Sequence, residues 1–235
     1  MPSADRLASL ARNFATKIQH LLNTTICDGV RISTVISEDP NLVLVGYGLA
    51  KPSLITEPFL VQIGRRKANC SLDISYRLCL DDASQYLTVI SSFFAVYAND
   101  AGRSCLCHFD YERDKAGGYP EAHLQVPGES AALQAMSGPA GKRSLDRLHF
   151  PVGGRRFRPI LEDVIEFLIV EKLARPRDDN WKNALDRERE AYYRIQVQAA
   201  IRRSPEIARQ ALNDLAAPVV PQQRGKRGVK LRRRA

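Results

Sequence analysis

A regular alternation of apolar and polar side chains runs from residue 68 to residue 80, and it restricts the fold more than any other feature of the chain. Successive side chains of an extended strand point to opposite faces, so this apolar set lies on one face. An amphipathic helix would need apolar residues every three or four positions instead. The segment therefore predicts a long strand with one face in a core and one in water. Its apolar residues are Ala68, Cys70, Leu72, Ile74, Tyr76, Leu78 and Leu80.

Other segments with extended-chain patterns lie on both sides of this strand. Residues 86–97 have large apolar side chains in both alternating sets, as in a strand that is covered on both faces. Short turn-like connections separate the segments, whereas parallel neighbours would need crossovers of about a dozen residues or more. We therefore expect an antiparallel sheet of about six or seven strands. The remaining candidate strands are 30–37, 41–48, 59–63, 103–111, 122–126 and 148–150.

Helical periodicity occurs before and after the strand region. Residues 3–22 place apolar side chains at three- and four-residue steps, which predicts an N-terminal helix packed on the sheet. Residues 160–173 are apolar on most sides and predict a buried helix, with Pro159 in its first turn and Pro176 after its end. Residues 179–203 predict a long polar helix. The predicted class is α+β, with one antiparallel sheet, an N-terminal helix and C-terminal helices.

Positive charge is concentrated at the C-terminal end. The last twelve residues carry seven cations and no acid, in a chain with a formal net charge of +9. A run of like charges builds no core, so we expect residues 217–235 to be a linker and a disordered basic tail. Before it we expect a single domain over residues 1–216, with strands mainly in 28–157 and helices mainly in 158–216. The tail cations are Arg224, Lys226, Arg227, Lys230, Arg232, Arg233 and Arg234.

The tail and the cysteines indicate partners and a compartment. A cationic run attracts polyanions through counterion release, so nucleic acid is the expected partner, with a merely solvated tail as the alternative. Five cysteines without a C-x-x-C pair fit neither a disulfide framework nor a zinc finger, which indicates the cytoplasm. No apolar stretch approaches the ~20 residues of a membrane span, so no membrane is expected. Cys105 and Cys107, two positions apart in a candidate strand, should share one face.

Three of the four histidines fall in candidate strands between residues 103 and 150. Alternation places His108 and Asp110 on the same face of their strand, opposite its apolar residues. In the next two segments, His123 and His149 likewise oppose the apolar side chains. If the three segments are neighbours in the sheet, these four polar side chains gather on one surface.

Such a group of side chains suits two chemistries. Imidazoles with a carboxylate can bind a divalent metal that keeps an open position for water. Two imidazoles can also act as general base and general acid in metal-free cleavage of RNA, in which the 2′-hydroxyl is the nucleophile. The alternative without a function is a set of half-exposed histidines on a solvated face. The pattern leaves open whether the protein is an enzyme and whether it binds a metal or cofactor.

The segment that follows His149 is a candidate phosphate site. Gly153 and Gly154 let the backbone approach a ligand closely, and the start of the next helix offers its positive dipole end. Three arginines supply forked donors for phosphate oxygens. The same residues also fit a tight turn whose arginines pair with acidic residues of the helix. The three arginines are Arg155, Arg156 and Arg158.

The run LHFPVGGRRFRPxLEDVIEFL at residues 148–168, with the block at residues 107–111, resembles a group of uncharacterised proteins from high-GC actinobacteria. The resemblance covers roughly the second half of the chain and implies a bacterial protein without an assigned activity. The excess of arginine over lysine fits a GC-rich genome.

Two functions follow as hypotheses. The first is a cytoplasmic protein that acts on nucleic acid, namely a small toxin-like ribonuclease in which His108, His123 and His149 serve as acid, base or ligand. RNA is its expected partner through the basic segments. The alternative is a non-catalytic interaction module in which the helix at 179–203 docks a protein partner and the basic tail contacts nucleic acid.

Overall fold

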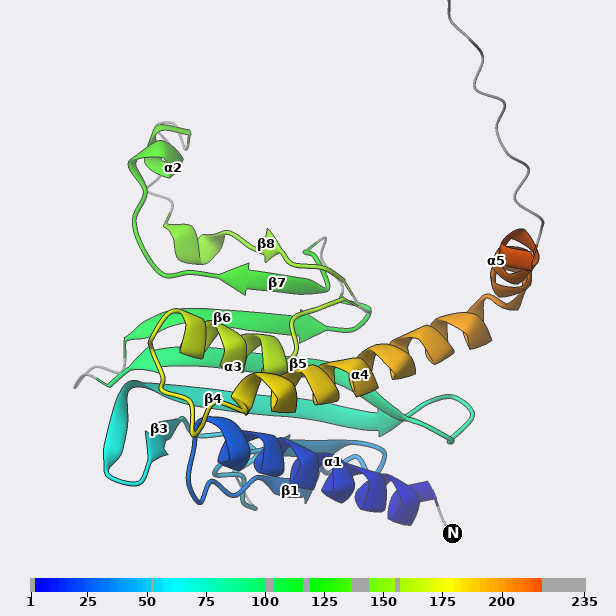
Figure 1. Cartoon of the computed structure of the whole chain (residues 1–235), viewed down its shortest axis with the longest axis horizontal. Helices are drawn as coiled ribbons and strands as arrows, with labels where there is room; N and C mark the ends of the chain where they lie inside the picture. Colours follow the sequence, from blue (N-terminus) through cyan, green and yellow to red (C-terminus); the bar gives the residue numbers. More distant parts are fainter. Residues whose placement is uncertain are drawn as a thin grey trace, which may run out of the picture. The chain divides into compact units, whose positions relative to one another are not determined.

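Among the described residues, an antiparallel sheet of eight strands forms the centre of the fold (Figure 1). The structure is a computed structural model that describes residues 3–51, 53–99, 104–115, 119–136, 144–154 and 157–216. The strands follow the order β1-β2-β4-β5-β6-β7-β8, and β3 pairs with β4 beside this path. They are β1 Ser33–Ile36, β2 Val43–Gly46, β3 Phe59–Ile63, β4 Arg66–Leu80, β5 Leu87–Ala98, β6 Cys105–Glu112, β7 Ala122–Gln125 and β8 Phe150–Pro151.

Helices precede, interrupt and follow the strands, and the predicted α+β class is confirmed. They are α1 Ser3–Thr25, α2 Ala131–Met136, α3 Leu161–Val170, α4 Trp181–Arg203 and α5 Pro205–Ala216, with a 3₁₀ helix at Leu145–Arg147. Contacts divide the chain into two compact units, Met1–Ala191 and Tyr192–Ala235. The first unit holds the sheet, α1, α2, α3 and the start of α4. The domain expected over residues 1–216 includes the first unit and the described part of the second. The tail cations lie outside the described residues.

The long strand β4 follows the predicted alternation. Leu72, Ile74 and Leu78 are buried on the core face, and Ser75 and Arg77 lie on the other face. This strand pairs with β2, β3 and β5, so it is the central element of the sheet. A single amphipathic strand therefore organises the core, because every neighbour must place its apolar face on the same side.

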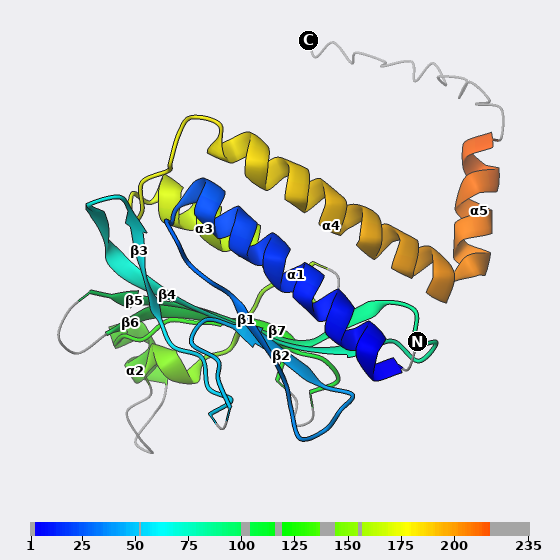
Figure 2. The ribbon, with the colours of Figure 1, turned by 90° about the horizontal axis from the view of Figure 1, so that it is seen from below.

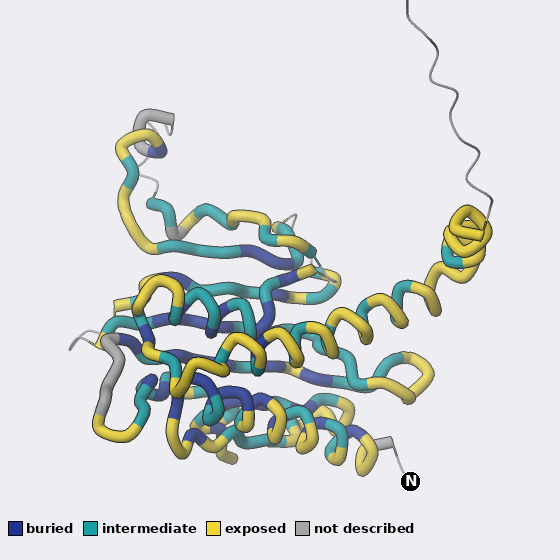
Figure 3. Tube along the Cα trace, in the orientation of Figure 1, coloured by how far each residue is buried: buried dark blue, intermediate teal, exposed yellow. Residues whose placement is uncertain are grey.

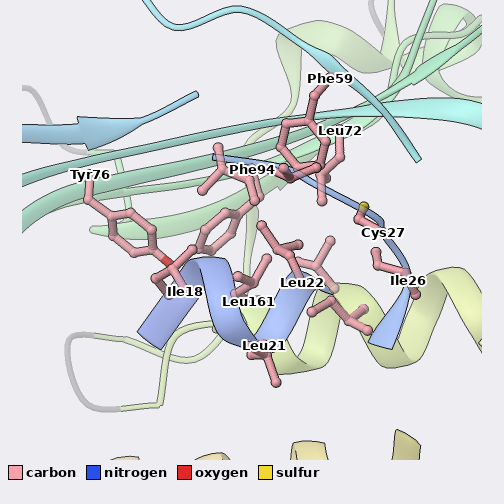
Figure 4. Close-up of a cluster of buried hydrophobic side chains, with 14 of the residues drawn as sticks. Ile18, Leu21, Leu22, Ile26, Cys27, Phe59, Leu72, Tyr76, Phe94 and Leu161 are labelled. Carbon is pink, nitrogen blue, oxygen red and sulfur yellow. The ribbon is translucent and has the colours of Figure 1, made fainter. Parts of the chain in front are cut away.

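Helices α1 and α3 cover the core face of the sheet, whereas α2 lies on the opposite side (Figure 2). Leu22 and Leu161 of these helices pack against Leu72 and Phe94 of the sheet (Figure 4). The Asn23 side chain, near the end of α1, both donates to and accepts from the Val30 backbone at 2.8 and 3.0 Å. This double hydrogen bond directs the chain from the helix into the sheet.

Helix α3 ends earlier than the sequence indicated. Its last residue is Val170, and Lys172 takes a left-handed backbone conformation with φ of 60°. The Ala174 N–H then donates to the Leu168 carbonyl at 2.8 Å, which closes the helix end. The chain therefore leaves the helix before it reaches Pro176. None of the described helices is both long and apolar enough to cross a membrane.

Candidate functional site

Strands β6 and β7 bring the predicted polar side chains onto one face of the sheet. His108 pairs with Gln125 and Asp110 pairs with His123 in their antiparallel register. Paired residues share a face, so these four side chains lie together, opposite the face that α1 and α3 cover. The facing predicted for the histidine strands is confirmed for β6 and β7. We call this surface the histidine face.

Cys105 lies on a different face of β6 from the one expected. Val96 pairs with Cys107, but the next pair is Tyr97 with Cys105, so a β-bulge leaves Leu106 without an opposite residue. The extra residue reverses the facing at this end of the strand. Cys107 is buried in the core, whereas Cys105 belongs with Tyr97 on the other side. The expectation that Cys105 and Cys107 share one face was wrong, because strict alternation takes no account of a bulge.

Asp110, Tyr119, His123 and His149 form one contiguous group, which we call the histidine cluster. The ring centroids of His123 and His149 lie 4.6 Å apart with the planes inclined at 62°. The ring of Tyr119 lies 4.2 Å from that of His149. On the other side of His123, its Nε2 is 3.7 Å from Asp110 Oδ2. The cluster joins β6, β7 and the residue before β8 at one end of the sheet.

His123 is the buried member of the cluster, with a side chain only 1% exposed. Its Nδ1 lies 3.3 Å from the Pro120 carbonyl oxygen, which can only accept, so Nδ1 carries the proton. In the neutral ring, Nε2 is then unprotonated and faces Asp110. Burial lowers the pKa of His123, although the Pro120 carbonyl and the Asp110 carboxylate partly oppose this effect. Burial therefore favours the neutral ring of His123 over the charged ring.

Asp110, Tyr119 and His149 are the accessible members, and the Asp110 side chain is 30% exposed. His149 is half-buried and Tyr119 is exposed. His108 lies on the same face but has other neighbours, because its Nε2 is 2.6 Å from Gln125 Oε1 and its ring contacts Phe93. The structure thus joins three of the four predicted residues, Asp110, His123 and His149, into the cluster.

Tyr119 was not among the candidates from the sequence. It precedes Pro120 in a connection between strands, outside any alternating pattern. The one available signal was an aromatic residue next to a histidine-bearing strand, and that signal is common in proteins.

Arg158 lies on the opposite side of the sheet from the histidines. Its side chain is 8% exposed, and its guanidinium carbon lies 4.4 Å from the centre of the Tyr111 ring. Tyr111 pairs with Ala122, and both belong to the face that packs against the core. Arg158 is thus engaged in a buried cation–π contact. Arg155 and Arg156 lie outside the described residues.

Gly153, the first of the two adjacent glycines, has a structural role. Gly153 has φ of 66°, and a Cβ atom there would lie 2.0 Å from the Phe157 carbonyl oxygen. The chain then turns into α3, where the Ile160 N–H donates to Asp163 Oδ2 at 3.0 Å. A carboxylate of the helix itself therefore occupies the positive end of α3. These contacts support the tight-turn interpretation of the segment.

Other polar features of the described residues lie apart from the cluster. No group of three or more histidine, cysteine, aspartate or glutamate side chains among them is placed to hold a metal ion. A surface pocket of about 340 Å³ lies between α1 and β1, with Arg12 and Lys51 at its edge. Asp73, on β4, is buried and its Oδ1 has no hydrogen-bond partner, and burial raises its pKa.

Comparison of the chain with protein-family models, curated proteins and solved structures gave no match.

Proposed function

We propose that this protein cleaves RNA by metal-free acid–base chemistry at the histidine cluster. The observation that carries the proposal is the contact between the buried His123 and the half-buried His149, with Asp110 3.7 Å from His123. Imidazole chemistry without a metal favours RNA over DNA, because RNA supplies its own nucleophile, the 2′-hydroxyl.

His149 and Tyr119 are the residues proposed to contact the substrate. The His149 imidazole takes the proton of the 2′-hydroxyl, whose oxygen attacks the adjacent phosphorus. The bond from phosphorus to the 5′-oxygen breaks, and the Tyr119 hydroxyl donates a proton to that leaving oxygen. The products are a 2′,3′-cyclic phosphate and a free 5′-hydroxyl. Return of a proton from His149 to Tyr119 through water restores both groups.

His123 and Asp110 are proposed as positioning residues. A neutral His123 lies against His149 without repelling the proton that His149 takes up, which a charged ring would do. Asp110 Oδ2 lies 3.7 Å from His123 Nε2, so Asp110 is proposed to hold the His123 ring in position. Arg147, exposed and two positions before His149 in the chain, is proposed to bind the scissile phosphate, and Lys115, whose charge acts on His123, adds to the positive field.

The test is incubation of the full chain with single-stranded RNA and DNA, each with and without chelator. We expect RNA cleavage that resists the chelator, cyclic phosphate ends, and intact DNA. His149→Gln should lower the rate by about 10²- to 10⁴-fold, and Tyr119→Phe should lower it as well. His20→Gln, which changes an exposed histidine of α1, should keep the wild-type rate. Absence of cleavage of any RNA, or full activity in His149→Gln, would refute the proposal.

A second candidate is the non-catalytic interaction module, which the C-terminal half of α4 favours. Tyr193, Val197 and Ile201 recur every four residues and are exposed, so they form an uncovered apolar stripe. In this case the helix docks a protein while the basic tail holds RNA. RNA binding should then weaken steeply with salt, with a slope that falls by about 5 when residues 224–235 are deleted. All histidine substitutions should leave that binding unchanged.

The five free cysteines support a reducing compartment for either function, and the cytoplasm fits both.

A further inference from the structure

Strand β1 is one edge of the sheet, and β2 lies on only one side of it. The Ser37 N–H donates to the Leu42 carbonyl at 3.0 Å, so residues 37 and 42 are a hydrogen-bonded pair of the register that joins β1 to β2. Hydrogen-bonded and non-hydrogen-bonded pairs alternate along antiparallel strands, so Thr34 and Ile36 direct their N–H and C=O groups away from β2. Among the described residues, no other strand pairs with this side of β1. The edge is therefore open to an added strand.

Helix α1 runs along this edge without closing it. Gln19 Oε1 accepts from the Ile32 N–H at 3.1 Å, so the helix satisfies the first donor of the edge. Arg12 lies seven residues earlier, about two helical turns, on nearly the same side of α1. Its guanidinium can only donate, so it cannot satisfy the next two N–H groups of the edge. Helix α1 has a buried side and an exposed side (Figure 3), and Arg12 is exposed.

The surface pocket between α1 and β1 lies beside this open edge. Its volume of about 340 Å³ is at the lower end of the range for ligand sites, about 300–1,000 Å³, so it suits a side chain better than a large ligand. Ile36 is 41% exposed here, although it pairs with the buried Val43. The lining residues are Ala8, Arg12, Thr34, Val35, Ile36, Val43 and Lys51.

The pocket carries two cations without a compensating acid. Among the described residues, neither the Arg12 side chain nor that of Lys51 has an ion-pair or hydrogen-bond partner. Glu38 and Asp39 follow β1, but Asp39 Oδ1 accepts from the Asn41 N–H at 2.9 Å within the turn. A second copy of β1 at this edge would bring the same cations together, so the charge disfavours a dimer through β1. It favours an acidic partner instead.

We propose that β1 binds an extended acidic peptide as an added strand. The peptide backbone pairs with the N–H and C=O groups of Thr34 and Ile36, which is the source of affinity in strand addition. One of its side chains enters the pocket, and an aspartate or glutamate contacts Arg12 and Lys51. Nucleic acid is also negative, but it offers no row of amide donors and acceptors at strand spacing, so the open backbone favours a peptide.

This site is separate from the histidine cluster. Strands β1 and β8 are at opposite ends of the strand order. Peptide binding at β1 therefore does not depend on the proposed cleavage of RNA, and either proposal can fail while the other holds.

The test is amide hydrogen exchange of the full chain, followed by NMR, with and without a synthetic octapeptide. The peptide alternates threonine and valine and has aspartate at its two central positions. Saturating peptide should slow exchange of the Thr34 and Ile36 amides at least about 10-fold, because both gain an acceptor. The Val35 amide already faces β2 and should change little.

Two control peptides separate strand addition from attraction by charge alone. The first has lysine in place of aspartate, and the second keeps aspartate but is methylated on alternate backbone nitrogens. Neither should protect Thr34 or Ile36, because the first lacks the acid and the second cannot pair its backbone. No protection by the original peptide at about 1 mM overturns the proposal, as does equal protection by the methylated peptide.

A matched pair of variants tests the charge. Arg12→Gln should raise the dissociation constant of the aspartate peptide about 3- to 10-fold. Lys17→Gln removes an exposed cation on another side of α1 and should stay within about 2-fold of wild type. Both changes are on the surface, so the thermal unfolding midpoint should stay near that of wild type. Equal affinities in the two variants would exclude Arg12 from the site and overturn the proposal.

Discussion

The rings of His123 and His149 meet edge to face with their centroids 4.6 Å apart, although the two residues belong to separate segments of the chain. The contact exists because β8 pairs with β7 in a register that sets Pro151 against His123 and Phe150 against Leu124. His149 directly precedes Phe150, so it lies diagonal to His123 on the same face of the sheet.

Replacement of His123 should change how stability depends on pH. Burial lowers the pKa of His123 in the folded protein, so the unfolded chain, with its ordinary value of 6.5, binds more protons in acid. The contribution of His123 to the free energy of unfolding is therefore complete above its ordinary pKa. It is lost as the pH falls below that value. The free energy of unfolding, measured with urea, should decrease less between about pH 7.5 and about pH 5.5 for His123→Gln than for the wild type. His20→Gln should match the wild type, and an unchanged loss in His123→Gln would contradict the prediction.

Replacement of Arg189 should loosen the start of α4 from α3. Its guanidinium donates to Glu166 at 2.6 Å, to Asp186 at 2.9 Å and to Asp163 at 3.1 Å, and its side chain is 16% exposed. Arg189→Met should lower the free energy of unfolding by about 1–2 kcal/mol, because Asp163 loses its ion-pair partner, and Glu166 and Asp186 keep only the more exposed Lys182. Arg187→Met, at a side chain that is 67% exposed, should cost less than about 0.5 kcal/mol. Equal losses in the two variants would contradict this role.

The Glu162 carboxyl group should lower the free energy of unfolding at neutral and alkaline pH. Burial raises the pKa of its carboxyl from 4.5 to about 7, and Asp163 and Glu188 add to this effect. Between these values the folded state binds more protons than the unfolded state, so stability falls as the pH rises through this window. Glu162→Gln should therefore stabilise the protein by ~2 kcal/mol at about pH 8 and have little effect at about pH 4. Glu171→Gln at an exposed position is the control, and a pH-independent gain in Glu162→Gln would count against this account.

A methyl group at Gly153 should disrupt the turn that follows β8. The added Cβ would lie 2.0 Å from the Phe157 carbonyl oxygen, and φ is 66°. Gly64 also has a positive φ, of 58°, but its Cβ position is open, so Gly64→Ala measures backbone strain alone. We expect thermal unfolding to show a loss of about 1–2 kcal/mol for Gly64→Ala and about 4 kcal/mol for Gly153→Ala. Similar losses in both variants would show that the close contact is unimportant.

The regular part of this fold was predictable from hydrophobic period alone. Alternation located β4 and the facing of His108, Asp110 and His123, because one buried face fixes the phase of an entire strand. Three- and four-residue spacing located α1 in the same way. The position of His149 beside His123 required one further assumption, that their strands are neighbours, and the register of β7 with β8 satisfies it.

The remaining features depend on local geometry that residue types do not reveal. A single bulge at Leu106 moves Cys105 to the other face without any glycine or proline to mark it. Arg158 has the sequence context of a phosphate ligand, yet the turn after Gly153 carries it onto Tyr111. Long side chains next to a turn have no period, so their direction follows only from the path of the backbone.

Because β8 has only two residues, the histidine cluster can come apart separately from the rest of the fold. The strand has two residues and lies at the end of the sheet, so few hydrogen bonds hold His149 in place. Local opening of this edge can separate the two imidazoles while the hydrogen bonds of β4 and the packing of α1 persist. The occupancy of the assembled cluster is then governed by a fluctuation at the edge, which amide hydrogen exchange at Leu124 would report, and not by the global unfolding equilibrium.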